Sequence, residues 1–159
     1  MKTKWRIKPT RPVMLIALLA GTIFGQTTGT WKMNPAKSKH PDQEPFPRSL
    51  VIRIEPHPEG EAVTLWHVTQ DGRSETDSYI VRYDGQDHPY PREERFDSFN
   101  AKKLEAGAVE VIYKKDGKVV ARQMRRLTAD GQQMTIQDQF LSKTGQWLNR
   151  VLVFEKQKE

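Results

Sequence analysis

From residue 50 onward, apolar and polar side chains alternate along the chain, and this alternation constrains the fold more than any other feature. Leu50, Ile52 and Ile54 recur at every second position, which is the period of a half-buried β-strand. A shorter strand is predicted at residues 29–33, and only residues 101–108 leave room for a helical turn. The same alternation predicts strands over residues 61–69, 75–83, 94–100, 108–114, 118–127, 133–141 and 146–155.

Dipeptides that end in glycine separate most of these strands, and glycine tolerates the positive φ of tight hairpin turns. They are Asp71-Gly72, Asp84-Gly85, Asp116-Gly117, Asp130-Gly131 and Thr144-Gly145. Pro89 and Pro91 interrupt the pattern and predict a wider connection over residues 85–92. Successive hairpins predict an antiparallel up-and-down meander of about eight or nine strands, which closes into a barrel and so hides its edges. A two-layer sandwich is the alternative.

The segment before the first strand resembles an export signal. Residues 1–12 carry Lys2, Lys4, Arg6, Lys8 and Arg11 without an acidic residue, and an apolar run follows over residues 13–24. That run is shorter than the roughly 20 apolar residues of a membrane-spanning helix. We expect a signal peptide over residues 1–25, cleaved after Gly25, and a periplasmic or extracellular domain over residues 26–159 without stable membrane insertion. An uncleaved anchor is the weaker alternative.

Charge and cysteine content exclude several functions. The chain has a net charge of +6, but five of its basic residues lie in the predicted signal peptide, which leaves +1 for the rest. We therefore expect no nucleic-acid binding. The absence of cysteine excludes disulfides, thiolate metal sites, a catalytic thiol and a lipid-modified cysteine. Residues 26–159 are long enough to form one domain around an apolar core.

Residues 34–48 are rich in proline and poor in apolar side chains. Pro35, Pro41, Pro45 and Pro47 cannot donate hydrogen bonds to a sheet. The segment is therefore predicted to be a long loop over one end of the domain, where it would serve as a lid or a plug.

Two separated motifs resemble the signature of the calycins, the superfamily of lipocalins and fatty-acid-binding proteins. They are Gly29-Thr30-Trp31-Lys32 at the first strand and Arg150 near the end of the last strand. The resemblance implies that Trp31 closes one barrel end and that Arg150 lies across its ring, a contact worth roughly 0.5–2 kcal/mol. Residues 29–38, 83–89 and 115–120 resemble, more narrowly, small exported lipocalin-like bacterial proteins, a family that implies a fold rather than an activity.

The motifs of common enzyme classes are missing. His40, His57, His67 and His88 do not stand at metal-ligand spacings, so no metal and no other cofactor is expected. No Gly-X-Ser-X-Gly elbow, phosphate-binding loop or dinucleotide fingerprint occurs. We expect no catalytic residue, although a hydrolase built from dispersed residues stays open.

The candidates for ligand binding are side chains within the predicted strands, because a barrel of about eight strands is either filled or holds one small ligand. Asp138 shares a face with Ile136 and Phe140, which is either the interior or the outer face. Arg122 and Arg126 share a face as well: inward, they would pair with a ligand carboxylate as in the fatty-acid-binding branch, and outward they are solvated. The full candidate set is Trp66, Tyr79, Tyr83, Tyr113, Arg122, Arg126 and Asp138.

The leading prediction is an exported lipocalin-like protein that binds a small hydrophobic or amphipathic ligand without catalysis. The second hypothesis is an envelope structural or protein-interaction module with a filled barrel, and the third is an enzyme of unknown type. A carrier requires a cavity of about 300 Å³ or more. An interaction module requires a packed interior, and an enzyme requires at least two titratable groups converging in one cleft.

Overall fold

The chain forms one curled antiparallel sheet. The computed structural model describes residues 27–42, 45–90 and 95–158, so the predicted signal peptide lies outside the described residues. Within these ranges, ten strands form a sheet in the order β4-β3-β2-β1-β10-β9-β8-β7-β6-β5. The predicted all-β meander is thus confirmed. No helix in the described part has both the length and the hydrophobicity needed to span a membrane.

Most of the strands begin and end within a few residues of their predicted bounds. They are β1 (Gly29–Met33), β2 (Ser49–His57), β3 (Gly60–Val68), β4 (Ser74–Val81), β5 (His88–Pro89), β6 (Ser98–Lys103), β7 (Val109–Lys115), β8 (Lys118–Leu127), β9 (Gln133–Leu141) and β10 (Trp147–Lys156). The short β5 was not predicted, because its proline breaks the pattern. The helical turn expected within residues 101–108 is the 3₁₀ turn η3 (Glu105–Gly107).

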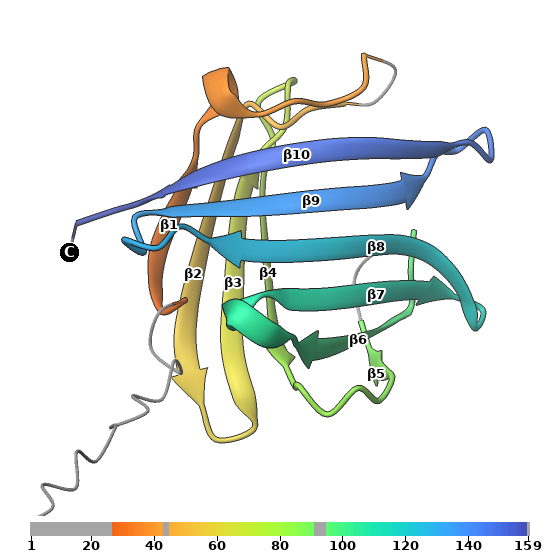
Figure 1. Cartoon of the computed structure of the whole chain (residues 1–159). Helices are drawn as coiled ribbons and strands as arrows, with labels where there is room; N and C mark the ends of the chain where they lie inside the picture. Colours follow the sequence, from red (N-terminus) through yellow and green to blue (C-terminus); the bar gives the residue numbers. More distant parts are fainter. Residues whose placement is uncertain (1–26, 43–44, 91–94, 159) are drawn as a thin grey trace, which may run out of the picture.

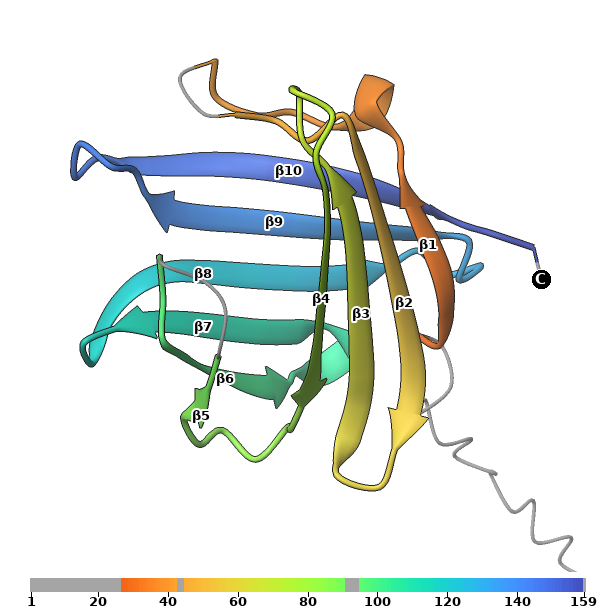
Figure 2. The ribbon, with the colours of Figure 1, turned by 180° about the vertical axis from the view of Figure 1, so that it is seen from behind.

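The sheet folds over on itself into two layers. In Figures 1 and 2, β1–β4 form one layer, and β6–β10 run steeply across it to form the other. The layers are joined where β1 pairs with β10, over the short stretch Trp31–Met33. At the opposite side, β4 and β5 are the two ends of the sheet and do not pair with each other. The result is a flattened, curled half-barrel. Its two layers face each other with crossed strands, as the layers of a β-sandwich do.

Glycine-containing turns join the paired strands. Gly72, Gly117, Gly131 and Gly145 have positive φ at the β3–β4, β7–β8, β8–β9 and β9–β10 turns, as predicted. Asp84-Gly85 begins the connection from β4 to β5, which in its described part is the wider connection predicted over residues 85–92 rather than a tight hairpin. The β2–β3 turn was missed. There, Gly60 has φ +148°, and a Cβ atom at that position would lie 2.0 Å from the carbonyl oxygen of Val81, so the turn requires glycine.

The inward faces of both layers form the core. Its largest fully buried side chains are Trp31, Ile54, Phe99, Met134 and Phe154, each from a different strand. These residues bring together segments far apart in the sequence, so the core depends on the curl of the whole sheet.

The expected contact between Trp31 and Arg150 is wrong. Lys156, the residue opposite Trp31 in the β1–β10 register, places its Nζ 5.4 Å from the centroid of the indole ring. Arg150 lies six positions earlier on β10 and is bound to Asp138 on β9. The Trp31 Nε1 group donates a hydrogen bond of 2.8 Å to the carbonyl oxygen of Thr27. The end of β10 therefore does supply a cation to Trp31, but from a residue closer to the terminus.

The proline-rich segment packs against one end of the half-barrel (Figure 1). After the 3₁₀ turn η2 (Pro35–Lys37), the backbone of Lys39 exchanges two hydrogen bonds with Val151 on β10. The His40 ring stacks on Phe46 at 4.0 Å between centroids, and Gln70 Nε2 donates to the Phe46 carbonyl oxygen at 2.7 Å. The described parts of this segment thus cover the end of the domain as an ordered loop.

Trp31 and Lys156 are expected to contribute very differently to stability. Trp31→Ala removes a fully buried side chain and should lower the free energy of unfolding by about 3–5 kcal/mol. Lys156→Ala removes mainly the cation above the ring and should lower it by roughly 0.5–1 kcal/mol. Urea titrations followed by far-ultraviolet circular dichroism measure both values, and equal losses would contradict the assigned roles.

Candidate ligand-binding cavity

A cavity of about 320 Å³ lies between the two layers. Its walls are mainly apolar and come from the inward faces of β2, β3 and β4 on one side and of β7–β10 on the other. Representative side chains are Ile52, Val63, Val111, Ile136 and Leu152. The alternation that builds each strand therefore places one apolar face of each layer toward a shared space that the core does not fill.

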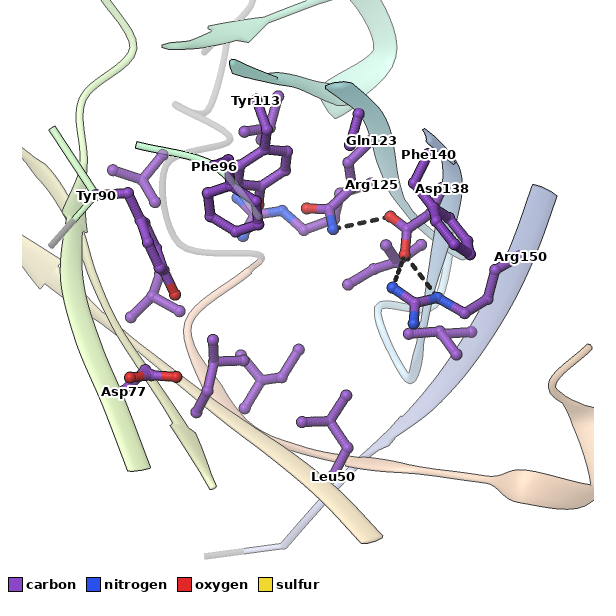
Figure 3. A pocket seen from close by; sticks show the side chains of 18 of the residues that line it. Leu50, Asp77, Tyr90, Phe96, Tyr113, Gln123, Arg125, Asp138, Phe140 and Arg150 are labelled. Carbon is purple, nitrogen blue, oxygen red and sulfur yellow. Dashed lines mark hydrogen bonds and ion pairs between the residues drawn. The ribbon is translucent and has the colours of Figure 1, made fainter. Parts of the chain in front are cut away.

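One wall of the cavity is aromatic. Tyr79, Tyr90, Phe96 and Tyr113 line it, with ring centroids 5.0 Å apart for Tyr79 and Tyr90 and 4.5 Å apart for Phe96 and Tyr113. Figure 3 shows Phe96 beside Tyr113, and the ring centroid of Tyr90 lies 4.7 Å from that of Phe96. Burial raises the pKa of Tyr79 to about 12 and that of Tyr113 well above its ordinary value. Both phenols are therefore protonated near neutral pH and carry hydroxyl groups that can donate hydrogen bonds.

A buried ion pair links the two layers. Arg125 on β8 donates from Nη2 to Glu61 Oε2 on β3 at 2.7 Å, and the same nitrogen lies 2.7 Å from the Tyr83 hydroxyl oxygen. The Tyr83 hydroxyl donates in turn to Glu61, and Thr27 Oγ1 donates to the other carboxylate oxygen at 2.5 Å. The side chains of Arg125 and Glu61 are only 9% and 7% exposed. This cluster thus satisfies both oxygens of Glu61 inside the domain.

The partners of Glu61 favour its charged form. Burial raises the pKa of Glu61, but the charge of Arg125 and the hydrogen bonds from Thr27 and Tyr83 outweigh burial, so the pKa lies below its ordinary value of 4.5. Arg125 lines the cavity, and its buried Nε has no hydrogen-bond partner in the described structure. The guanidinium charge is therefore matched by Glu61, while one of its N–H groups is unsatisfied.

A second ion pair also lines the cavity. Arg150 on β10 donates to Asp138 Oδ2 from Nη2 at 2.6 Å and from Nε at 3.0 Å, while Gln123 Nε2 donates to Oδ1 at 3.0 Å. Figure 3 shows these three side chains converging beside Phe140. The guanidinium carbons of Arg150 and Arg95 each lie 5.2 Å from the centroid of the Phe140 ring. Arg150 also borders a second cavity of about 260 Å³ beneath the proline-rich segment.

The structure places the predicted ligand-binding residues at the cavity, next to it or away from it. Tyr79, Tyr113 and Asp138 line the cavity, so Asp138 takes the inward of its two predicted orientations. Tyr83 lies next to the cavity and holds the Glu61–Arg125 pair. Trp66 is 40% exposed on the outward face of β3 and does not reach the cavity.

The inward orientation considered for Arg122 and Arg126 is wrong. Both side chains are exposed, whereas Arg125 between them points inward together with Gln123. The sequence is ambiguous here, because both faces of β8 mix apolar and basic side chains. Glu61 was also missed, although it shares the inward face of β3 with Val63. An acid on one apolar face and a base on another is the signal that would have indicated a buried ion pair.

Gly29 begins β1 with φ +130°, beside the side chain of Lys156. In the part of the chain that the structure describes, no three His, Cys, Asp or Glu side chains gather in a way that would hold a metal ion. Arg125, Asp138 and Arg150, which line the cavity, are engaged in the two ion pairs described above.

Replacing Glu61 is expected to produce a pH-dependent loss of stability. Glu61→Gln leaves Arg125 buried without its counter-charge and should lower the free energy of unfolding by about 3 kcal/mol at pH 7. Because the folded-state pKa of Glu61 is depressed, its contribution is complete above about pH 4.5 and is lost as the pH falls through the folded-state pKa. Urea titrations from pH 7 to pH 3 should therefore show wild type and variant converging in acid. A difference that does not change with pH would contradict this.

Comparison with known proteins supports the architecture. No family model matches this chain, and no curated protein matches it. Among solved structures, it is similar to the zebrafish ileal bile acid-binding protein complexed with cholic acid, with a TM-score of 0.50 and 14% sequence identity, over 83% of this chain and 99% of that chain. At this level of identity the similarity concerns the fold alone. The chain thus has a calycin-type fold, a β-meander curled around an internal cavity.

Proposed function

We propose that this chain is an exported binding protein that holds one small hydrophobic or amphipathic ligand between its two sheet layers and performs no chemistry on it. The observation that carries the proposal is the cavity of about 320 Å³ at the centre of the domain. Ligand sites are typically concave and mainly apolar, with a few placed polar groups, and begin at about 300 Å³. One solved structure of similar fold is a bile acid-binding protein, which supports the same proposal.

The cavity argues against the second hypothesis, a filled barrel that acts only through its outer surface. A packed interior would leave no space of this size between the inward faces of β2–β4 and β7–β10. The large exposed apolar side chains of the described part are Trp66, Leu104 and Trp147, which lie on β3, before η3 and at the start of β10. They are scattered over separate elements, and scattered exposed residues are normal for soluble proteins.

Filling the cavity should abolish ligand binding. Ala121 on β8 lines the cavity, so Ala121→Trp places an indole ring in the space proposed for the ligand. We expect at least about a tenfold loss of affinity for the neutral fluorescent probe N-phenyl-1-naphthylamine. Ala62→Trp is the matched control, because Ala62 is partly exposed on the outward face of β3, and its affinity should equal that of wild type. Fluorescence titrations measure both, and circular dichroism checks that each variant folds.

If wild type binds neither the probe nor any lipid detectable by mass spectrometry after native purification, the proposal fails. If Ala121→Trp binds the probe as well as wild type does, the cavity between the layers is not the binding site.

The export part of the proposal is supported by the basic and apolar pattern of residues 1–24. Full-length chain produced in a Gram-negative bacterium should appear in the periplasmic or secreted fraction, with a mass that corresponds to a first residue Gln26. Replacing the apolar Leu15 and Leu18 by Arg should keep the chain at full length in the cytoplasm. Recovery of uncleaved wild-type chain in the cytoplasmic fraction would contradict export.

A further inference from the structure

The charged side chains that line the cavity differ in whether they already have a partner of opposite charge. Two of the arginines that line it already have carboxylate partners: Arg125 is bound to Glu61 and Arg150 to Asp138. Arg95 lies over the ring of Phe140. A ligand carboxylate entering the cavity would therefore compete with an existing, closer carboxylate at Arg125 and at Arg150.

Asp77 differs from the other acids at the cavity. It lies on β4, on the same inward face as Tyr79 and Val81, and its half-buried side chain lines the cavity. Figure 3 shows the Asp77 carboxylate at the wall on the same side as Tyr90. Within the described residues, this carboxylate has no hydrogen bond or ion pair. Glu75, two positions earlier, is held by His67 at 3.4 Å, so Asp77 is the acid of this face that is left for a ligand.

A carboxylate beside an apolar space favours a cation, because a charge that is partly removed from water is stabilised by an opposite charge nearby. The apolar walls of the cavity would contact the apolar part of such a ligand, and the carboxylate of Asp77 on β4 would contact its positive charge. A ligand of negative charge would instead be repelled by Asp77.

We propose that the cavity is selective for an amphipathic amine, whose apolar body lies between the layers and whose ammonium group donates to the carboxylate of Asp77. The inference rests on the proposed function, since it names the class of ligand that the same cavity takes. It also separates this chain from the solved structure of similar fold, which was complexed with cholic acid.

The experiment compares three probes that share a ten-carbon chain and differ only in the head group: decylamine, 1-decanol and decanoate. Each displaces N-phenyl-1-naphthylamine from the purified domain at pH 7, and the fluorescence loss gives the affinity. Decylamine should bind wild type about tenfold more tightly than decanoate, which is the size expected of a hydrogen bond between charged groups.

The variant Asp77→Asn keeps the shape of the side chain and removes its charge. It should weaken decylamine binding about tenfold and leave 1-decanol within about twofold. Since Asp77 has no described partner, its replacement should not destabilise the fold. Glu55→Gln is the control, because it removes the same charge from an exposed position on the outward face of β2 and should leave all three affinities unchanged.

The outcomes distinguish the two proposals. If wild type binds decanoate as tightly as decylamine, or if Asp77→Asn does not weaken decylamine binding, the cavity is a ligand site but the selectivity for amines is overturned. An equal effect in Asp77→Asn and Glu55→Gln would assign the preference to overall charge and would overturn it too. If neither the fluorescent probe nor any ten-carbon compound binds wild type, both proposals fail.

Discussion

Besides the β1–β10 pairing, the Glu61–Arg125 ion pair is a buried charged contact that constrains how the two layers lie against each other. Glu61 belongs to β3 and Arg125 to β8, so their hydrogen bond of 2.7 Å crosses from one layer to the other. Apolar contacts between the layers have little directional preference, whereas a buried ion pair with a shared phenol fixes one relative position.

Much of the fold was predictable from the sequence, because a β-meander is encoded locally. The alternation of apolar and polar residues at every second position predicts the strands. Glycine at Asp116-Gly117 or Asp130-Gly131 predicts the turns. Features that depend on pairing between distant strands were not predictable in this way. The register between β1 and β10 decides that Lys156, and not Arg150, lies above Trp31. A shift of a few residues along one strand changes which side chain meets the indole ring without changing the alternation.

The candidate site was predicted less completely, for two physical reasons. On β8 both faces carry basic residues, so alternation alone does not say whether Arg122 and Arg126 or Arg125 face the interior. An internal cavity exists only if the strands enclose slightly more volume than their inward side chains fill. This difference is too small to be read from the sequence. Tyr79, Tyr113 and Asp138 do line the cavity, because the alternation of β4, β7 and β9 turns their side chains inward, and their role in ligand binding stays a prediction.

The unpaired ends of the sheet, β4 and β5, have a consequence for access to the interior. Every other junction between neighbouring strands is a ladder of backbone hydrogen bonds, but between β4 and β5 there is none. On this side the ring contacts from Tyr79 to Tyr90 and Phe99 hold the sheet ends together. Because side chains change rotamer more easily than a backbone ladder breaks, this is the side of the sheet that can open without loss of backbone hydrogen bonds between strands.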